Sequence, residues 1–170
     1  LLAYSLLNVW RKPLPQVLKN RIMDPIGASS TWRWYGYESS WVTMDGQKMQ
    51  SVSGGGHSGG GLFISTEDLA RFGLLFQRDG RWKDRDLISK DWIERVQKPS
   101  EANPSYGYMW WLNKGEEKWN NQVSSSVYYA AGFGGNYIVV DKEHELVVVV
   151  RWIEVDKMDA FMELVAQATY

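Results

Sequence analysis

The chain has 170 residues, of which 44% are apolar, and its 19 basic and 20 acidic residues give a formal net charge of −1. This composition is typical of a folded chain with a hydrophobic core, and no excess of charge points to nucleic acid or a membrane surface as a partner. Cysteine is absent, which excludes disulfides, thiolate nucleophiles and cysteine-rich metal sites. The apolar run LVVVVRWI near the end is too short to span a bilayer, so no membrane span is expected.

Helical spacing of apolar residues marks the first part of the chain. Leu2, Leu6 and Val9 predict a helix over residues 1–11, which the following prolines end. A second helix is predicted from Leu14 to the sequence DPIG, where proline and glycine interrupt the pattern.

Residues 28–61 show no lasting period and are rich in Ser, Gly and Trp. They predict a long ordered loop with short strands, and loops of this length tend to carry function. The candidates for the wall of an aromatic pocket are Trp32, Trp34, Tyr35 and Tyr37, with simple packing as the alternative. The loop ends in GGGHSGGG, six glycines around one histidine.

The clearest predicted helix follows these glycines. Ser65 or Thr66 can cap it, and Glu67 and Asp68 lie in its first turn, where the helix dipole favours negative charge. Gly80 ends this helix. A shorter helix is predicted next in SKDWIERVQK, between its capping serine and the proline that follows.

Beyond the second of these helices the pattern changes from helical to extended. Segments rich in β-branched and aromatic residues predict a strand meander over 106–153, with strands at 106–112, 126–131, 135–141 and 145–153. The sequence DKEHE joins the last two as a hairpin, which predicts that they are antiparallel. Residues 155–169 predict a closing helix. This order indicates an α+β fold, an antiparallel sheet meander flanked by helices.

Few residues of the chain fall into a motif for metal binding, phosphate binding or nucleophilic catalysis. His57 and His144 are the only histidines, far apart in the sequence, so no metal site is expected, and no cofactor motif is present. The glycine loop lacks the lysine of a phosphate-binding loop. No serine lies in Ser-x-x-Lys. Ser58 lies in Gly56-His57-Ser58-Gly59-Gly60, which has the spacing of Gly-x-Ser-x-Gly, but neighbouring side chains in an extended loop point apart, so His57 is not expected to be its base.

Several segments in order carry a resemblance to a known family. LPQVLKNRIMDPIGASSTWRW, GGGLFISTEDLARFGLLFQRDGRW, YGYMWWLN and AAGFGGNYIVVDKEHELVVVVRW follow one another as in the serine β-lactamase-related family. That family includes class C β-lactamases, DD-peptidases, esterases and amide hydrolases. The resemblance runs from about Leu14 to Trp152. It implies that residues 1–170 are the C-terminal portion of a single β-lactamase/transpeptidase-like domain.

The resemblance also implies what would complete the site. The family's nucleophile lies in Ser-x-x-Lys and its proton carrier in Tyr-x-Asn, and both are expected before residue 1. Tyr4-Ser5-Leu6 lacks the asparagine, so we expect Tyr4 to be a core residue instead. The missing N-terminal part of the same protein is therefore the expected partner. Export to the periplasm or medium is possible for such a relative, but the compartment stays open because no signal peptide is visible.

The family's Lys-Thr-Gly or His-Thr-Gly triplet matches Ala130, Ala131 and Gly132 by position. The resemblance implies that the backbone N–H of Phe133 after it is an oxyanion donor. A backbone donor survives the change of side chains, and one such donor contributes about 2.7–4 kcal/mol to acyl transfer. The triplet's cation is replaced by alanine, which disfavours substrates held by a carboxylate. An uncharged ester or amide fits better.

Further residues are expected around the same cleft. The resemblance implies that Gly59 to Leu62, with Gly60 and Gly61 among them, form its wall and that His57 lies near the rim. Gly134 and Trp34 are expected beside the substrate. His57 either contacts substrate or is a loop histidine that bonds backbone and does no chemistry.

Three hypotheses follow for the function. The first is a serine hydrolase that cleaves a small ester or amide through an acyl-enzyme, inactive without the missing part. The second is a non-catalytic ligand-binding module with an aromatic cleft, a degenerate member of the same family. The third is a short protein that buries its sheet by self-association.

Overall fold

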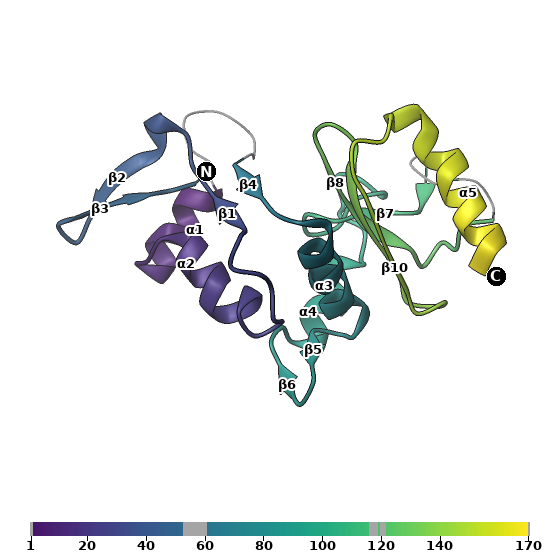
Figure 1. Ribbon diagram of the computed structural model, residues 1–170, viewed down its shortest axis with the longest axis horizontal. Helices are drawn as coiled ribbons and strands as arrows, with labels where there is room; N and C mark the ends of the chain where they lie inside the picture. The colour runs from purple at the N-terminus through teal and green to yellow at the C-terminus, as the bar shows by residue number, and fades with distance from the viewer. Residues whose placement is uncertain (1, 53–60, 116–118, 120–121, 170) are drawn as a thin grey trace. The chain divides into compact units, whose positions relative to one another are not determined.

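The computed structural model describes residues 2–52, 61–115, 119 and 122–169 (Figure 1). The chain divides into two compact units, Leu1–Asp68 and Leu69–Tyr170. Each unit has its own elements and core, and each is described by itself. The assignment of residues 1–170 to a single domain stays a prediction.

The first unit begins with the two predicted helices. Helix α1 spans Leu2–Trp10, and α2 spans Leu14–Leu18 and continues as a π-helical turn over Lys19–Met23. The prolines next to Leu14 lie at the start of α2, where a missing N–H costs no helical hydrogen bond. The sequence therefore predicted both helices, and only the π-helical turn was not foreseen.

Helix α1 packs through a different face from the one marked by the spacing of Leu2, Leu6 and Val9. Leu7 is fully buried against Met44 and Met49, whereas Leu2 and Val9 are exposed. Tyr4 is 50% exposed, so its assignment to the core is wrong. A helix with apolar residues on several sides does not reveal from its sequence which side is covered.

Two short antiparallel strand pairs and a 3-10 turn follow in and next to the region expected to be a long loop. Strand β1 (Arg33–Trp34) pairs with β4 (Leu62–Phe63), and β2 (Trp41–Met44) pairs with β3 (Gln47–Gln50) after a 3-10 turn at Glu38–Ser40. The β2–β3 hairpin supplies Met44 and Met49 to the small core beneath α1. Residues 28–52 of this region are thus ordered around short strands, as predicted.

A buried carboxylate ties the loop to the next helix. Helix α3 spans Thr66–Gln77, and the Ser65 hydroxyl accepts from the Asp68 N–H at 3.1 Å, as an N-cap does. Asp68 itself is fully buried, and its two oxygens accept from the Ser29 N–H at 2.9 Å and the Ser29 hydroxyl at 2.6 Å. The acidic first turn was predicted, but its role as an anchor for a residue 39 positions earlier was not.

The second unit is built on one antiparallel sheet. Its order is β10-β9-β8-β7, with β7 at Trp111–Leu112, β8 at Tyr128–Gly132, β9 at Asn136–Asp141 and β10 at Leu146–Val150. The β9–β10 hairpin predicted from DKEHE is confirmed, with Asp141 opposite Leu146. The α+β class with an antiparallel sheet is confirmed as well.

Helices cover both faces of this sheet (Figure 1). On one face Phe76 of α3 and Ile93 of α4 (Lys90–Val96) pack against Tyr128 and Val140. Gly73 allows this close approach, because a Cβ there would lie 2.6 Å from Val147 Cγ1. On the other face α5 (Met158–Thr169), which follows a 3-10 turn at Val155–Lys157, packs Met158, Phe161, Met162 and Val165 against Tyr129, Tyr137 and Val139.

Neighbouring side chains along β7 and β8 point to opposite faces of the sheet, and each face is covered by helices. Trp110 and Tyr128 belong to the face of α3 and α4, while Trp111 and Tyr129 belong to the face of α5. The strand expected at 106–112 is short, because only Trp111 and Leu112 pair with β8. The residues before them form a tight turn in which the Gly107 N–H donates to the Trp110 carbonyl at 2.8 Å.

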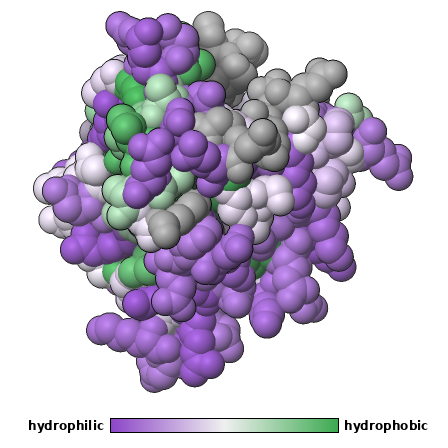
Figure 2. All heavy atoms as spheres, turned by 90° about the vertical axis from the view of Figure 1, so that its right-hand side faces the viewer, coloured by the Kyte–Doolittle hydropathy of each residue, from purple (hydrophilic) through white to green (hydrophobic). Residues whose placement is uncertain are grey.

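The remaining strands of the second unit lie in the connection between α3 and α4. A small hairpin of β5 (Arg81–Trp82) and β6 (Arg85–Asp86) joins α3 to α4, whose N-cap is the predicted Ser89. Seen from the side of α5, the surface is mostly hydrophilic with small separate apolar groups (Figure 2). No helix in the described parts of the chain has the length and apolar character needed to cross a membrane.

We predict that Asp68→Asn destabilises the first unit by about 2 kcal/mol, because the new amide would face one of the two Ser29 donors. Glu67→Gln, one residue earlier and exposed, is the matched control and should cost at most about 1 kcal/mol through the helix dipole. Urea denaturation of both variants measures the difference. Equal losses would show that the Asp68–Ser29 contact does not stabilise the fold.

Candidate functional site

The end of β8 has a strand partner on one side only. Strand β7 pairs with Tyr128 and Tyr129, whereas Ala130, Ala131 and Gly132 pair with β9 alone. Within the described strands, the other edge of these three residues has no ladder partner. This edge coincides with the triplet that the sequence singled out, so its backbone is open to an approaching ligand.

Phe133 lies just beyond the strand. The β8–β9 ladder ends at the pair Gly132 and Asn136, so the Phe133 N–H is not part of it. The Phe133 side chain is fully exposed. An amide at such a position can donate to an external acceptor, as an oxyanion donor must.

The turn that carries Phe133 is held by neighbouring backbone and side chains. Asn136 Nδ2 donates to the Phe133 carbonyl at 2.7 Å, and Arg151 Nε donates to Asn136 Oδ1 at 3.2 Å. The Ile153 N–H donates to the Gly135 carbonyl at 3.2 Å. Gly135 has a φ of +71°, and a Cβ there would lie 1.7 Å from the Ile153 carbonyl oxygen. Only glycine therefore fits this turn.

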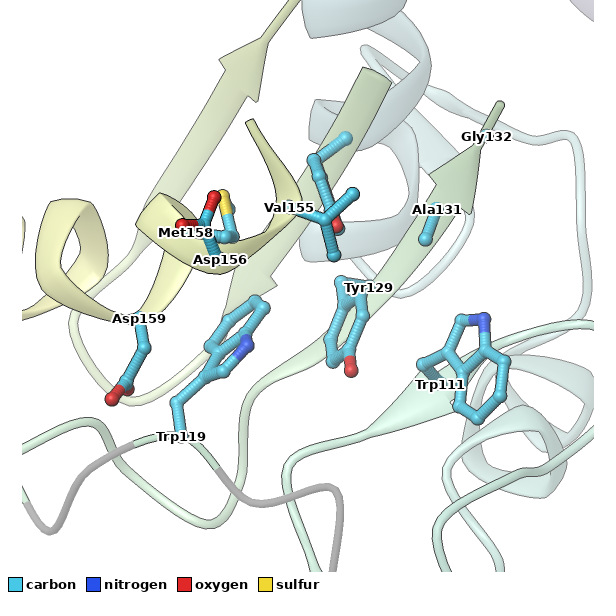
Figure 3. A pocket seen from close by; sticks show the side chains of 10 residues that line it. Trp111, Trp119, Tyr129, Ala131, Gly132, Val155, Asp156, Met158 and Asp159 are labelled. Atoms are coloured by element: carbon cyan, nitrogen blue, oxygen red, sulfur yellow. The ribbon is translucent and has the colours of Figure 1, made fainter. Parts of the chain in front are cut away.

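A cavity of about 600 Å³ opens beside this strand end, on the α5 face of the sheet. Figure 3 shows it between the aromatic side chains of the sheet and the start of α5. Strand residues, the loop residue Trp119, two residues of the 3-10 turn before α5 and two in the first turn of α5 form its lining. The lining residues are Trp111, Trp119, Tyr129, Ala131, Gly132, Tyr137, Val155, Asp156, Met158 and Asp159.

Near-parallel rings form the aromatic wall of this cavity. Trp119 stacks on Tyr129 with ring centroids 4.3 Å apart and planes 23° apart, and Trp111 lies 6.5 Å from Tyr129 at 17°. The buried Asn113 fixes Trp119, because its Oδ1 accepts from the Trp119 N–H at 2.6 Å. This hydrogen bond and the ring stacking thus both hold Trp119 in the wall.

Two tyrosines near the site are held as neutral phenols. Burial raises the pKa of Tyr137, which lines the cavity. Burial, and secondarily the charge of Asp79, raise the pKa of Tyr128, whose hydroxyl donates to the Phe76 carbonyl at 3.2 Å. Neither phenol is suited to accept a proton at neutral pH.

The serine hydroxyls whose hydrogen bonds the structure defines have structural partners. Ser29 donates to Asp68 at 2.6 Å, Ser124 to Glu143 at 2.6 Å, and Ser105 to the Lys114 carbonyl at 2.6 Å. Across the described ranges no three His, Asp or Glu side chains gather in a way that would hold a metal ion.

The predicted site residues fall into three groups. Ala131 and Gly132 line the cavity, with Phe133 and Gly134 in the adjoining turn and Ala130 packed on the opposite face of the sheet. Trp34 lines a different pocket, of about 400 Å³ in the first unit, together with Trp32 and Tyr35. Gly61, with a φ of +80°, lies against the Tyr35 backbone in the same unit. His57 and Gly60 lie outside the described residues.

The chain is similar in sequence to one known protein family. The sequence pattern of the β-lactamase family matches residues 4–153. The chain belongs to the β-lactamase family. The resemblance seen in the sequence is confirmed, and the expected hydrolase fold with it. A comparison with curated proteins gives no match.

Two solved structures share the fold of this β-lactamase family chain. A proposed 6-aminohexanoate-dimer hydrolase from Bacillus anthracis is similar over 98% of the chain, with a TM-score of 0.71 and 19% identity. A proposed β-lactamase from Bacteroides dorei is similar over 79% of the chain, with a TM-score of 0.50 and 17% identity. The chain spans 41% of the length of the first and 43% of the second.

Sequence reasoning missed part of the cavity. Trp119 lies in a polar stretch with no period, and Asp156 and Asp159 read as ordinary acidic residues before and within the first turn of a helix. One signal was available: Trp110 and Trp111 are neighbours in the expected strand at 106–112, and successive strand residues point to opposite faces of a sheet. In the structure Trp110 is buried and Trp111 lies in the cavity wall.

We predict that Gly135→Ala destabilises the second unit by at least about 2 kcal/mol more than Gly46→Ala destabilises the first. Both glycines have positive φ, +71° and +73°, but a Cβ at Gly46 meets no atom within 4 Å. The matched control therefore carries only the cost of the left-handed conformation, about 1 kcal/mol. Chemical denaturation measures both, and equal losses would show that the turn is not pinned against Ile153.

Proposed function

We propose that this chain contributes the oxyanion donor and one wall of the binding site to a serine hydrolase that cleaves an ester or amide through an acyl-enzyme. The observation that carries the proposal is the Phe133 N–H, which lies beyond the ladder at an open strand edge and beside a cavity. Membership of the β-lactamase family supports the hydrolase class. The strand triplet at this position supports the role of the amide.

The proposed reaction proceeds in two acyl transfers. A serine hydroxyl attacks the substrate carbonyl carbon, its proton passes to a general base, and the carbonyl electron pair moves onto oxygen. The Phe133 N–H donates to this oxyanion, the leaving group departs with a proton, and water then releases the acyl group by the same steps. The chain holds no Ser-x-x-Lys or Tyr-x-Asn, so we propose that serine and base lie outside these 170 residues.

The proposed substrate carries no carboxylate at the strand edge. Ala130 and Ala131 stand where relatives have a cation and a hydroxyl, so a substrate carboxylate would find no partner from these side chains. An ester or amide without such a group loses nothing by this replacement. We therefore favour an esterase or amidase over a true β-lactamase.

A second candidate function is a non-catalytic binding module. The same two alanines favour it, because a degenerate site can keep the fold and lose the reaction. The aromatic cavity would then serve binding alone. His57, Gly60, Gly61 and Trp34 remain proposed as further contacts to the ligand in either function.

Covalent labelling distinguishes the two candidates. The complete polypeptide that contains this chain should react with a fluorophosphonate probe, and the chain alone should not. Peptide mapping of the labelled site should find a serine outside residues 1–170. A labelled serine within residues 1–170 would contradict the proposed roles, and no labelling of the complete polypeptide would favour the binding module.

Substitutions at Phe133 test the amide itself. Phe133→Pro removes the N–H and should lower kcat for ester hydrolysis by roughly 10²–10³-fold. Phe133→Ala keeps the N–H and removes only an exposed side chain, so its kcat should fall far less. Both variants are measured in the complete polypeptide, with the melting temperature as a check on folding. Equal losses in kcat would count against the amide as oxyanion donor.

A further inference from the structure

We infer that Asn136 is a positioning residue for the proposed reaction: its carboxamide holds Phe133 in the place from which the Phe133 N–H meets the substrate carbonyl. This inference rests on the proposed function, in which that N–H donates to the oxyanion. It names a side chain that does not itself touch the reacting atoms and on which the rate nevertheless depends.

The chain around Phe133 does little to fix the position of this residue by itself. Gly132 precedes it, and Gly134 and Gly135 follow it. Glycine populates more backbone conformations than other residues, so such a run is intrinsically loose. The Phe133 side chain is fully exposed, so packing does not anchor it either. The position of the Phe133 amide therefore depends on contacts to the backbone of the turn.

Asn136 supplies such a contact at the point where the ladder closes. It forms the last pair of β8 and β9 with Gly132, and its Nδ2 reaches back to donate to the Phe133 carbonyl at 2.7 Å. Phe133 is thus held on its N-terminal side through Gly132 in the ladder and on its C-terminal side through its own carbonyl. The residue cannot move as a whole without breaking one of these contacts.

Arg151 fixes the orientation of the Asn136 carboxamide. Its Nε donates to Asn136 Oδ1 at 3.2 Å. A guanidinium only donates and a backbone carbonyl only accepts, so the amide oxygen must face Arg151 and the amide nitrogen must face Phe133. An ionised aspartate would present two acceptors here, and a leucine of similar shape would present neither group. The position therefore requires the donor and the acceptor of a carboxamide.

The segment after β10 supports the turn at two further points. A Cβ at Gly134 would lie 2.6 Å from Cζ3 of Trp152, so the indole ring lies directly against this glycine. The Ile153 N–H donates to the Gly135 carbonyl at 3.2 Å. Trp152 has a φ of +61°, which is uncommon for a bulky residue and persists only where the surroundings fix the backbone. Residues 151–153 thus form a fixed support for the turn.

A purely structural role for Asn136 is the alternative, and it makes a different prediction. If the hydrogen bond only stabilises the turn, its loss lowers the melting temperature and affects kcat equally whether or not the Phe133 N–H is present. If Asn136 acts through that N–H, the loss of rate depends on the N–H being there. A double-mutant cycle measures this dependence.

Asn136→Leu in the complete polypeptide removes both hydrogen bonds and keeps the approximate shape of the side chain. We expect kcat for p-nitrophenyl butanoate to fall roughly 10–100-fold with KM within about twofold, because the lost contact acts through a bond made in the transition state. In a Phe133→Pro background the same substitution should lower kcat by less than about twofold. The melting temperature of each variant checks folding.

Gln97→Leu is the matched control. Gln97 Nε2 donates to the Ile93 carbonyl at 2.7 Å, so the same kind of bond over the same distance is lost at the end of α4, on the other face of the sheet. This variant should lose stability by about 1 kcal/mol. Its kcat should equal that of the unsubstituted protein.

NMR relaxation of the Phe133 amide reads its position without any reaction. In the complete polypeptide labelled with ¹⁵N-phenylalanine, the order parameter of this N–H should be about 0.85 in the unsubstituted protein and about 0.6 or lower in Asn136→Leu. Gln97→Leu should leave it unchanged. If Phe133→Pro does not fold, kcat and this order parameter must both fall in Asn136→Leu, and a fall in only one of them overturns the inference.

Each outcome decides one of the two claims. An unchanged kcat in Asn136→Leu, or an equal loss with and without the Phe133 N–H, overturns the inference and leaves the hydrolase intact. Absence of ester hydrolysis by the unsubstituted polypeptide contradicts the proposed function. In that case an unchanged order parameter overturns the inference as well, whereas a lowered one supports the hold of Asn136 on Phe133 as a feature of a binding site.

Discussion

Strand β8 is paired along its whole length by β9 and at its first two residues only by β7, and this uneven pairing shapes the candidate site. A strand with two complete neighbours has its N–H and C=O groups occupied and cannot receive a ligand. Because β7 begins only at Trp111, which pairs with Tyr129, the backbone of Ala130 to Gly132 keeps one open edge within the described sheet. The first residue beyond this edge presents its amide outside the ladder.

The open edge of β8 can hold a backbone donor in a fixed position only because the rest of the second unit is rigid. Tyr128 is anchored in the core beneath α3 and α4, and Tyr129 in the core beneath α5, so β8 is gripped from both faces. The turn after it is pinned at Gly135 by the Ile153 backbone and at Phe133 by Asn136. Preorganisation of this kind lets a single backbone donor stabilise a developing charge without moving. The stacked rings of Trp119 and Tyr129 line the cavity beside the same rigid edge.

The sequence predicted the parts of this arrangement that depend on local pattern. The closing helix at 155–169 and the β9–β10 hairpin follow from residues close together in the chain, and the family resemblance pointed to the Ala130–Gly132 triplet. The cavity escaped prediction because its wall joins Trp111, Trp119 and residues 155–159, which only the folded sheet brings together. The burial of Asp68 and the exposure of Tyr4 escaped it because both depend on which neighbour covers a helix face, and helical spacing does not contain that information.

The most direct measurement is a crystal structure of the complete polypeptide after reaction with a phosphonate ester that mimics the tetrahedral intermediate. The account predicts a phosphonyl oxygen about 2.7–3.1 Å from the Phe133 nitrogen, with the phosphorus bonded to a serine outside residues 1–170. A phosphonyl oxygen bound elsewhere, with the Phe133 N–H paired to protein, would contradict it.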